Sequence, residues 1–88
     1  MTWELRVAAS AERTLARLPS SAATAIVEFM VGPLDEDPYR VGKALQRELG
    51  AYHSARRGAY RAVYRIAEGD GTVRVVRIEH RADVYRNR

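Results

Sequence analysis

Apolar and polar positions alternate most clearly from Tyr60 to Ile66. There the even-numbered positions are aromatic or aliphatic, whereas the odd-numbered ones include Arg61 and Arg65. A period of two is typical of a β-strand with one buried and one exposed face. We therefore expect a strand that packs Tyr60 and Tyr64 inward and holds arginines on its other face.

Neighbouring segments predict the rest of an antiparallel meander. Tyr52–Arg57 is expected to form a strand, with a turn or bulge at Gly58. Glu68–Gly71 has the composition of a hairpin turn, and the Val- and Ile-rich segment Thr72–His80 predicts the next strand. We expect residues 81–88 to form a tail or a short final helix.

The first half of the chain predicts one strand and two helices. Trp3–Val7 alternates like a strand, and Ser10 can cap a helix that ends at Leu18, before Pro19. A second helix is expected from Ser20 or Ser21 to about Val31, where Gly32-Pro33 ends or bends it. Three residues share one face of this helix at helical spacing: Ile26, Phe29 and Met30.

Two further segments of this region are predicted to connect the helices to the following strands. Asp35–Pro38 predicts an acidic loop, and residues 39–50 predict either one helical turn or an irregular connection. The element order is thus β-α-α-β-β-β. We expect a single α+β domain over residues 1–88, an antiparallel sheet with the two N-terminal helices packed on one face. The other face would carry Arg61, with His80 and Arg81 at the strand ends.

Charge is distributed unevenly along the chain. Residues 1–38 carry three basic and six acidic side chains, whereas residues 39–88 carry twelve basic and five acidic ones. A concentrated basic field favours a polyanion, and nucleic acid is the first candidate. Fourteen of the fifteen basic residues are arginine, which suits bidentate contacts to phosphate. A GC-rich genome explains much of the arginine content, but not the asymmetry.

Several classes of site are excluded or disfavoured by composition. The chain has no cysteine, so disulfides and thiolate metal sites are excluded, and a reducing cytoplasm is expected. Two histidines without a supporting acidic cluster make a poor metal site, and neither nucleotide-binding glycine motif occurs. The N-terminal residues resemble neither a signal peptide nor a membrane span. We expect no cofactor.

The remaining polar residues fit RNA chemistry without a metal. Cleavage requires deprotonation of a 2′-hydroxyl, stabilisation of the pentavalent phosphate and protonation of the leaving 5′-oxygen. Arginine, histidine and tyrosine can supply these functions. The candidates are Arg56, Arg57, Arg61, His80, Arg81 and Tyr85. Any basic RNA-binding module contains such a set, so the residue types alone do not prove catalysis.

Some of these residues also have a structural interpretation. Arg57 and Arg65 are interpretable as solvated surface charges, and His53 as a structural histidine on its strand. Packing that anchors the C-terminal segment is the competing role for Tyr85. Arg61 and Arg81 are the strongest functional candidates, because the strands present them on the uncovered side.

The stretch VGKALQRELGAYHSARRGAYRAVYRI, from Val41 to Ile66, and the ending HRADVY, from His80 to Tyr85, resemble the RelE/ParE superfamily of bacterial toxins, most closely its RelE-like branch. This resemblance implies a RelE-like microbial RNase fold and a toxin of a type II toxin–antitoxin system. RelE-like toxins enter the ribosomal A site and cut messenger RNA by attack of the 2′-hydroxyl, which inhibits translation.

The resemblance also implies residue roles. Arg61 matches the arginine that stabilises the phosphate, Arg81 the arginine after the last strand, and Tyr85 a stacking or base residue; His80 joins the catalytic set. The RNA-binding residues are expected to be Lys43, Arg47, His53, Arg56, Arg57 and Arg65. The best-known RelE toxins carry two lysines on the strand before the glycine turn, and the resemblance aligns His53 and Ala55 of this chain with them. Either the neighbouring arginines supply that charge, or His53 transfers the proton.

The implied partners are a cognate antitoxin, RelB-like or Phd/YefM-like, the ribosome and messenger RNA. Operator DNA is expected only through the antitoxin complex, and a membrane is not expected. Two alternatives stay open at this point. One is a ParE-like inhibitor of DNA gyrase, which shares the fold without the RNase site. The other is a non-catalytic member that acts only in transcriptional autoregulation.

Overall fold

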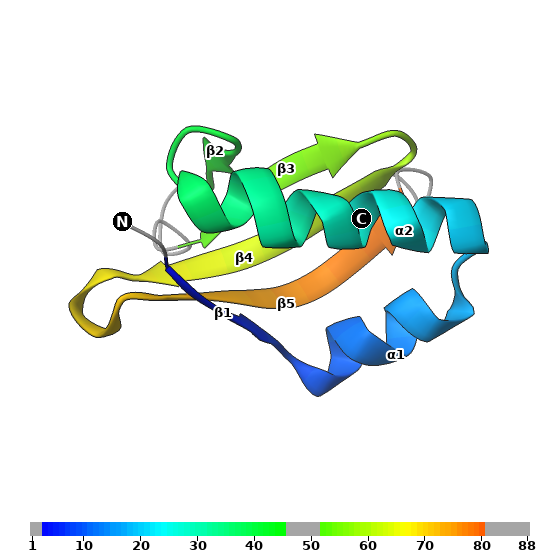
Figure 1. Ribbon diagram of the computed structural model, residues 1–88, viewed down its shortest axis with the longest axis horizontal. Helices are drawn as coiled ribbons and strands as arrows, with labels where there is room; N and C mark the ends of the chain where they lie inside the picture. The colour runs from blue at the N-terminus through cyan, green and yellow to red at the C-terminus, as the bar shows by residue number, and fades with distance from the viewer. Residues whose placement is uncertain (1–2, 46–51, 81–88) are drawn as a thin grey trace.

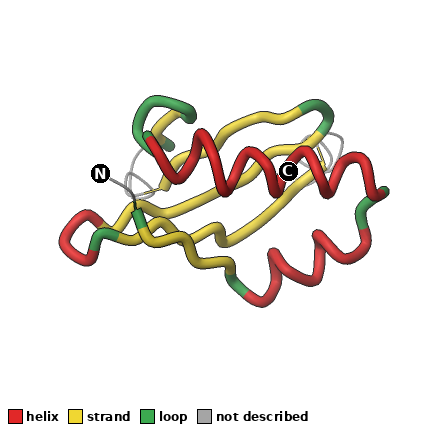
Figure 2. The backbone as a smooth tube through the Cα atoms, viewed as in Figure 1, coloured by secondary structure: helices red, strands yellow, loops and turns green. Residues whose placement is uncertain are grey.

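The computed structural model describes residues 3–45 and 52–80, which form a helical layer on one five-stranded sheet (Figure 1). Both helices, α1 (Ala9–Arg17) and α2 (Ser20–Phe29), lie on the same side of the sheet (Figure 2). The strand order is β1-β5-β4-β3-β2. The strands are β1 (Glu4–Val7), β2 (Lys43–Ala44), β3 (Tyr52–Arg57), β4 (Tyr60–Ala67) and β5 (Thr72–His80). The predicted α+β class and element order are confirmed, with β2 as an additional strand.

The sheet is mixed rather than wholly antiparallel. Strands β2 to β5 form the expected antiparallel meander, whereas the edge strand β1 pairs in parallel with β5. The prediction of an antiparallel sheet therefore does not hold for β1. Alternation identifies a strand, but its direction relative to a partner depends on how the intervening helices return the chain.

Glycines at both hairpin turns adopt the left-handed conformation. Gly58 follows β3 with φ 62°, and Gly71 follows a 3₁₀ turn at Glu68–Asp70 with φ 68°. Side chains with a Cβ rarely adopt such angles, which is why glycine is suited to these positions. Both turns lie where the sequence predicts them.

The second helix continues past its predicted end. A π-helical segment, Met30–Leu34, follows α2 directly and contains Pro33. Gly32-Pro33 therefore does not terminate the helix. Proline has no N–H and its ring crowds the carbonyl four residues earlier, and a wider π turn is a recognised accommodation in a helix.

The core lies between the helices and one face of the sheet. Ile26, Phe29 and Met30 are buried there, as their spacing predicts. Tyr64 on β4 is fully buried, and its phenol donates a hydrogen bond of 2.7 Å to the carbonyl oxygen of Pro38. Burial, together with the nearby charge of Asp37, raises the pKa of Tyr64 to about 12, so this phenol stays a donor at neutral pH.

Candidate functional site

The sheet surface that α1 and α2 leave uncovered, called the open face below, gathers most of the strand arginines. Alternation along β4 buries Ala62 and Tyr64 under the helices and leaves Arg61 and Val63 on the other side. The pairing register extends this division across the sheet. The open face includes Glu4, Arg6, Lys43, Tyr52, Ser54, Arg56, Arg61, Val63, Arg65, Arg74, Val76, Arg77 and Glu79.

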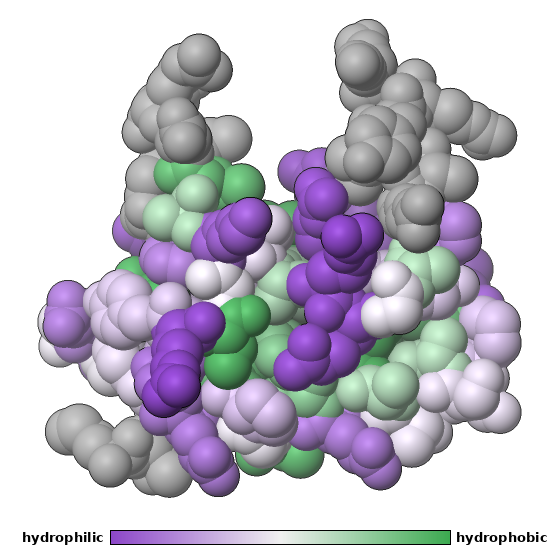
Figure 3. Space-filling view, turned by 90° about the horizontal axis from the view of Figure 1, so that it is seen from above, coloured by the Kyte–Doolittle hydropathy of each residue, from purple (hydrophilic) through white to green (hydrophobic). Residues whose placement is uncertain are grey.

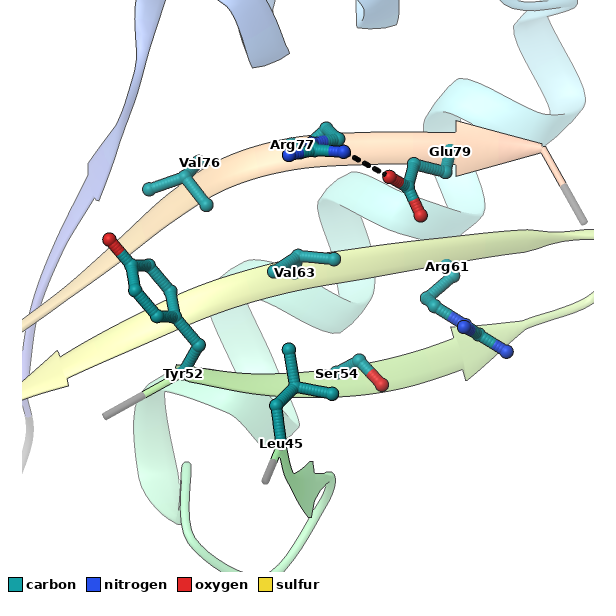
Figure 4. Close-up of a pocket in the computed structure, with 8 residues that line it drawn as sticks. All are labelled: Leu45, Tyr52, Ser54, Arg61, Val63, Val76, Arg77 and Glu79. Carbon is teal, nitrogen blue, oxygen red and sulfur yellow. Dashed lines mark hydrogen bonds and ion pairs between the residues drawn. The ribbon is translucent and has the colours of Figure 1, made fainter. Parts of the chain in front are cut away.

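Arg61 stands at the boundary between two hollows on this face. One hollow, of about 420 Å³, has Arg56 and Lys43 among its lining residues. The other, also about 420 Å³, includes Val63 and the ring of Tyr52 (Figure 4). Arg61 lines both hollows. Seen from the edge of the molecule where β2 and β3 lie, hydrophilic side chains gather with hydrophobic ones between them (Figure 3).

The basic hollow has the composition of an anion site. Arg56 lies directly opposite Arg61 in the β3–β4 register, and Lys43 is on the adjoining strand. Within the described ranges, neither Arg56 nor Arg61 has a carboxylate partner in a salt bridge. Guanidinium groups that make no salt bridge on adjacent strands fit the fork geometry of a phosphate.

A β-bulge decides which residues of β5 reach the open face. Val63 lies opposite Arg77 and Tyr64 opposite Val75, so Val76 is an extra residue in β5. Val76 and Arg77 therefore both face the open side, and Glu79 follows them (Figure 4). An ion pair of 2.7 Å joins the Arg77 guanidinium to the Glu79 carboxylate.

The start of α1 supports this bulge. The hydroxyl of Ser10 donates a hydrogen bond of 3.1 Å to the carbonyl oxygen of Val76, and the Ala8 N–H donates one of 2.8 Å to the carbonyl oxygen of Val75. Ser10 therefore does not cap the helix as the sequence predicts; α1 begins at Ala9 without a side-chain cap. Its hydroxyl instead satisfies a carbonyl near the irregular point of the sheet.

A second group of arginines crosses the opposite end of the open face. Arg6 lies opposite Arg74, and Arg74 lies opposite Arg65. We call these three residues the arginine row. They line a hollow of about 790 Å³ that also includes the acidic residues Glu4 and Asp70, and a 2.7 Å ion pair joins Arg6 to Glu4. Like charges directly opposite each other destabilise a sheet, so the row favours an anionic partner.

His53 is not on the open face. It is 8% exposed, lies on the helix-covered side and stacks against Tyr64, with ring centroids 5.7 Å apart. Its Nδ1 is buried without a hydrogen-bond partner in the described structure, and desolvation lowers its pKa. Successive residues of a strand face opposite sides of the sheet, so the His53 side chain points away from the face that carries Arg61. This position does not fit the predicted RNA contact or proton transfer. The structural interpretation of His53 fits instead.

Two further candidates point away from Arg61. The His80 ring meets the ring of Tyr60 at 5.0 Å, and Tyr60 packs against the core, so His80 lies on the helix-covered side. The Arg57 guanidinium lies 4.2 Å from the centroid of the Phe29 ring, on that same side. The prediction that groups these two residues with Arg61 is therefore not supported by their placement. Arg47, Arg81 and Tyr85 lie outside the described residues.

The open face also includes residues that the sequence interpretation missed. Ala55, like His53, is buried under the helices, so the β3 residues that share the open face with Arg56 and Arg61 are Tyr52 and Ser54. Counting alternate residues back from Arg56 would have found both. Arg77 and Glu79 were not predictable in this way, because the bulge shifts the alternation by one residue.

The described residues offer neither a metal site nor a membrane-spanning helix. Across residues 3–45 and 52–80, no group of three or more histidine, aspartate or glutamate side chains is arranged to hold a metal ion. In the same ranges no helix is long and apolar enough to cross a membrane.

Comparison with known proteins gives one consistent family. Residues 5–85 match the family described as the ParE toxin of the type II toxin–antitoxin system parDE. Two toxins of Mycobacterium tuberculosis (strain ATCC 25618 / H37Rv) are similar to the chain. RelG is 48% identical over 98% of this chain and 99% of its own length, and RelE is 45% identical over 96% and 87%.

Solved structures agree with this grouping. The toxin–antitoxin complex RelBE2 of M. tuberculosis contains a chain with a TM-score of 0.86 and 44% identity, covering 92% of this chain and 100% of that one. A mutant of the E. coli toxin RelE in the free state gives a TM-score of 0.78 at 20% identity, covering 98% and 93%. The second likeness concerns the fold alone.

Proposed function

We propose that this chain, which belongs to the RelE/ParE family of toxins of type II toxin–antitoxin systems, cleaves messenger RNA in the ribosomal A site without a metal ion. The RelG and RelE toxins of M. tuberculosis, which the chain resembles over nearly its whole length, support this assignment. The proposed activity inhibits translation and arrests growth.

One observation carries the proposal. Arg61 is fixed on a central strand of the open face, has no carboxylate partner among the described residues and lies directly opposite Arg56. A sheet holds a side chain more rigidly than a loop, and rigid donors stabilise developing charge without reorganisation during the reaction. This is the arrangement that a pentavalent phosphate requires.

The proposed step is an in-line transesterification. The 2′-oxygen of one nucleotide loses its proton and attacks the adjacent phosphorus, and the bond from phosphorus to the 5′-oxygen breaks. The leaving 5′-oxygen receives a proton, so the products are a 2′,3′-cyclic phosphate and a 5′-hydroxyl. Arg61 and Arg56 stabilise the negative charge on the non-bridging oxygens.

Proton transfer is assigned to the C-terminal segment. Tyr85 remains the proposed stacking or base residue, and Arg81 the proposed second phosphate ligand; Arg47 remains a proposed RNA contact. His80 is less suited to proton transfer at Arg61, because its ring packs against Tyr60 on the other side of the sheet. Lys43, Arg56 and Arg65 keep their proposed RNA-binding roles, since all three are exposed on the open face.

The proposed partners follow from the family. RelE-type relatives have been crystallised as toxin–antitoxin complexes, from M. tuberculosis and from Pyrococcus horikoshii. We propose a cognate antitoxin for this chain as well, with operator DNA bound only through that complex. The ribosomal target places the proposed action in the cytoplasm.

The decisive experiment compares wild type, Arg61→Ala and Arg13→Ala after induced expression in a bacterial host, with primer extension on an abundant message. Arg13 is an exposed arginine on α1 and serves as the matched control. Cuts confined to translated codons are expected for wild type and Arg13→Ala. We expect Arg61→Ala to reduce cutting by about 100- to 1000-fold, the typical effect of losing one donor to a transition-state oxyanion.

Gyrase inhibition is the second candidate, because the matching family is described by its ParE member. Growth arrest without message cleavage, accompanied by a DNA-damage response, would favour it and contradict the RNase proposal. A protein that causes no growth arrest in soluble, well-expressed form would instead fit the non-catalytic alternative.

A further inference from the structure

The hollow on the other side of Arg61 differs in chemistry from the basic one. Val63 lies at its centre, flanked by Val76, Leu45 and the ring of Tyr52 (Figure 4). These apolar groups lie on the open face, which neither α1 nor α2 covers. Apolar groups at the centre of the hollow and polar side chains around them suit a flat ring with a polar edge.

The two hollows are adjacent and share lining residues. Arg61 and Ser54 line both of them, so a group bound in one is next to a group bound in the other. The basic hollow fits a phosphate, and the hollow around Val63 has room for a planar base at about 420 Å³. In a single RNA strand, a phosphate and a neighbouring base are likewise adjacent to each other.

The rim of the hollow around Val63 offers polar contacts. The Arg77–Glu79 ion pair lies along β5 above Val63, with the Glu79 side chain 20% exposed and the Arg77 side chain 67% exposed (Figure 4). A carboxylate repels phosphate, so the Glu79 carboxylate beside Arg61 is suited to a different part of the RNA. A carboxylate accepts hydrogen bonds from the exocyclic amino group of a base such as cytosine, whereas uracil has no such group.

We propose that this hollow, the base pocket, receives a nucleobase of the RNA whose phosphate Arg61 binds, with the base stacking on Tyr52 and its exocyclic amino group donating to Glu79. The inference rests on the proposed function and adds a specificity determinant to it. Stacking on an aromatic side chain tolerates every base. Discrimination against uracil therefore falls to Glu79.

The test maps cut sites across the transcriptome for wild type, Tyr52→Ala, Tyr52→Phe and Glu79→Gln, with Arg13→Ala as the control. Tyr52→Ala is expected to cut about tenfold less, the loss of one base-stacking contact. Tyr52→Phe keeps the ring and is expected to restore cutting. For Glu79→Gln, uracil is expected to become more frequent at the position that wild type restricts. Thermal unfolding of the purified variants separates these effects from loss of fold.

Two other results overturn the inference in distinguishable ways. If Tyr52→Ala is folded and its cut sites match those of wild type in number and base composition, the base pocket is wrong and the RNase function stands. If wild type itself makes no cuts, the proposed function fails and the base pocket fails with it.

Discussion

Arg56 and Arg61 lie directly opposite each other across the β3–β4 pair, both on the open face of the sheet. Like charges in this position oppose folding, and salt weakens that effect. The pair is therefore costly for stability and useful for binding an anion. Such a conflict between folding and binding is typical of a functional surface.

Replacing Arg56 by glutamine is expected to stabilise the protein while weakening its action on RNA. The free energy of unfolding should rise by about 0.2–1 kcal/mol at low salt, because the cross-strand repulsion is removed. Chemical denaturation at low and high salt measures this, and the gain should shrink at high salt. Arg13→Gln is the control and should change neither quantity. A variant that is less stable than wild type would contradict the interpretation of this pair.

The arginine row predicts a salt-dependent contribution to RNA affinity. Each phosphate contact makes the plot of log binding constant against log salt concentration steeper by about 0.7 for a single strand. Arg74→Gln and Arg65→Gln should each make this plot less steep by about that amount in a titration with single-stranded RNA. Arg6→Gln should have a smaller effect, because the Glu4 carboxylate already pairs with Arg6 at 2.7 Å. Equal slopes in all variants would exclude the row from the interface.

Stability is expected to fall in mild acid because of His53. Desolvation lowers the pKa of His53 in the folded protein below its usual value of 6.5. The unfolded chain therefore binds the proton more readily, and the free energy of unfolding decreases as the pH falls below about 6.5. Below the folded-state pKa, this loss becomes constant.

Thermal unfolding between about pH 5 and pH 8 measures this dependence. His53→Phe keeps a ring between Tyr39 and Tyr64 and removes the buried nitrogen that has no partner. The difference between the two proteins should grow toward acid pH. A constant difference across that range would show that His53 titrates alike in the folded and unfolded states.

Gly42 and Gly32 should respond oppositely to alanine. A Cβ at Gly42 would collide with the Tyr64 hydroxyl and lie 2.8 Å from the carbonyl oxygen of Ser54, so Gly42→Ala should cost about 1–3 kcal/mol. The same collision disturbs the hydrogen bond from Tyr64 to Pro38. A Cβ at Gly32 meets no atom within 4 Å, and Gly32→Ala in a helical segment should add about 0.5–1 kcal/mol. Urea denaturation of both variants tests this; a stable Gly42→Ala protein would contradict it.

Local patterns were sufficient to predict much of this fold. The period of two placed Tyr64 in the core and Arg61 on the other side, and helical spacing identified Ile26 and Phe29 as buried. These inferences succeed because alternation and helical period reflect burial directly. For the same reason, the position of Tyr52 and Ser54 on the open face could have been predicted from the sequence.

The errors share a different cause. His80 was grouped with Arg61 as a catalytic candidate at a strand end, but the extra residue Val76 shifts the alternation in β5 and turns His80 to the helices. The residues around Val76 do not predict that bulge. The carbonyl oxygen of Val76 accepts its hydrogen bond from the hydroxyl of Ser10, which is far away along the chain. The same holds for the parallel pairing of β1, which depends on β5 at the opposite end of the described chain.

The sequence by itself determined the order of the elements, the core of the second helix and the arginine-bearing face of β4, because each depends on the periodicity of neighbouring residues. Only the tertiary structure decided which residues of β5 join Arg61. It brought Arg77 and Glu79 to the open face and turned His80 away from it. Strand register and a single bulge control that selection, and both are set by hydrogen bonds between segments distant in the chain.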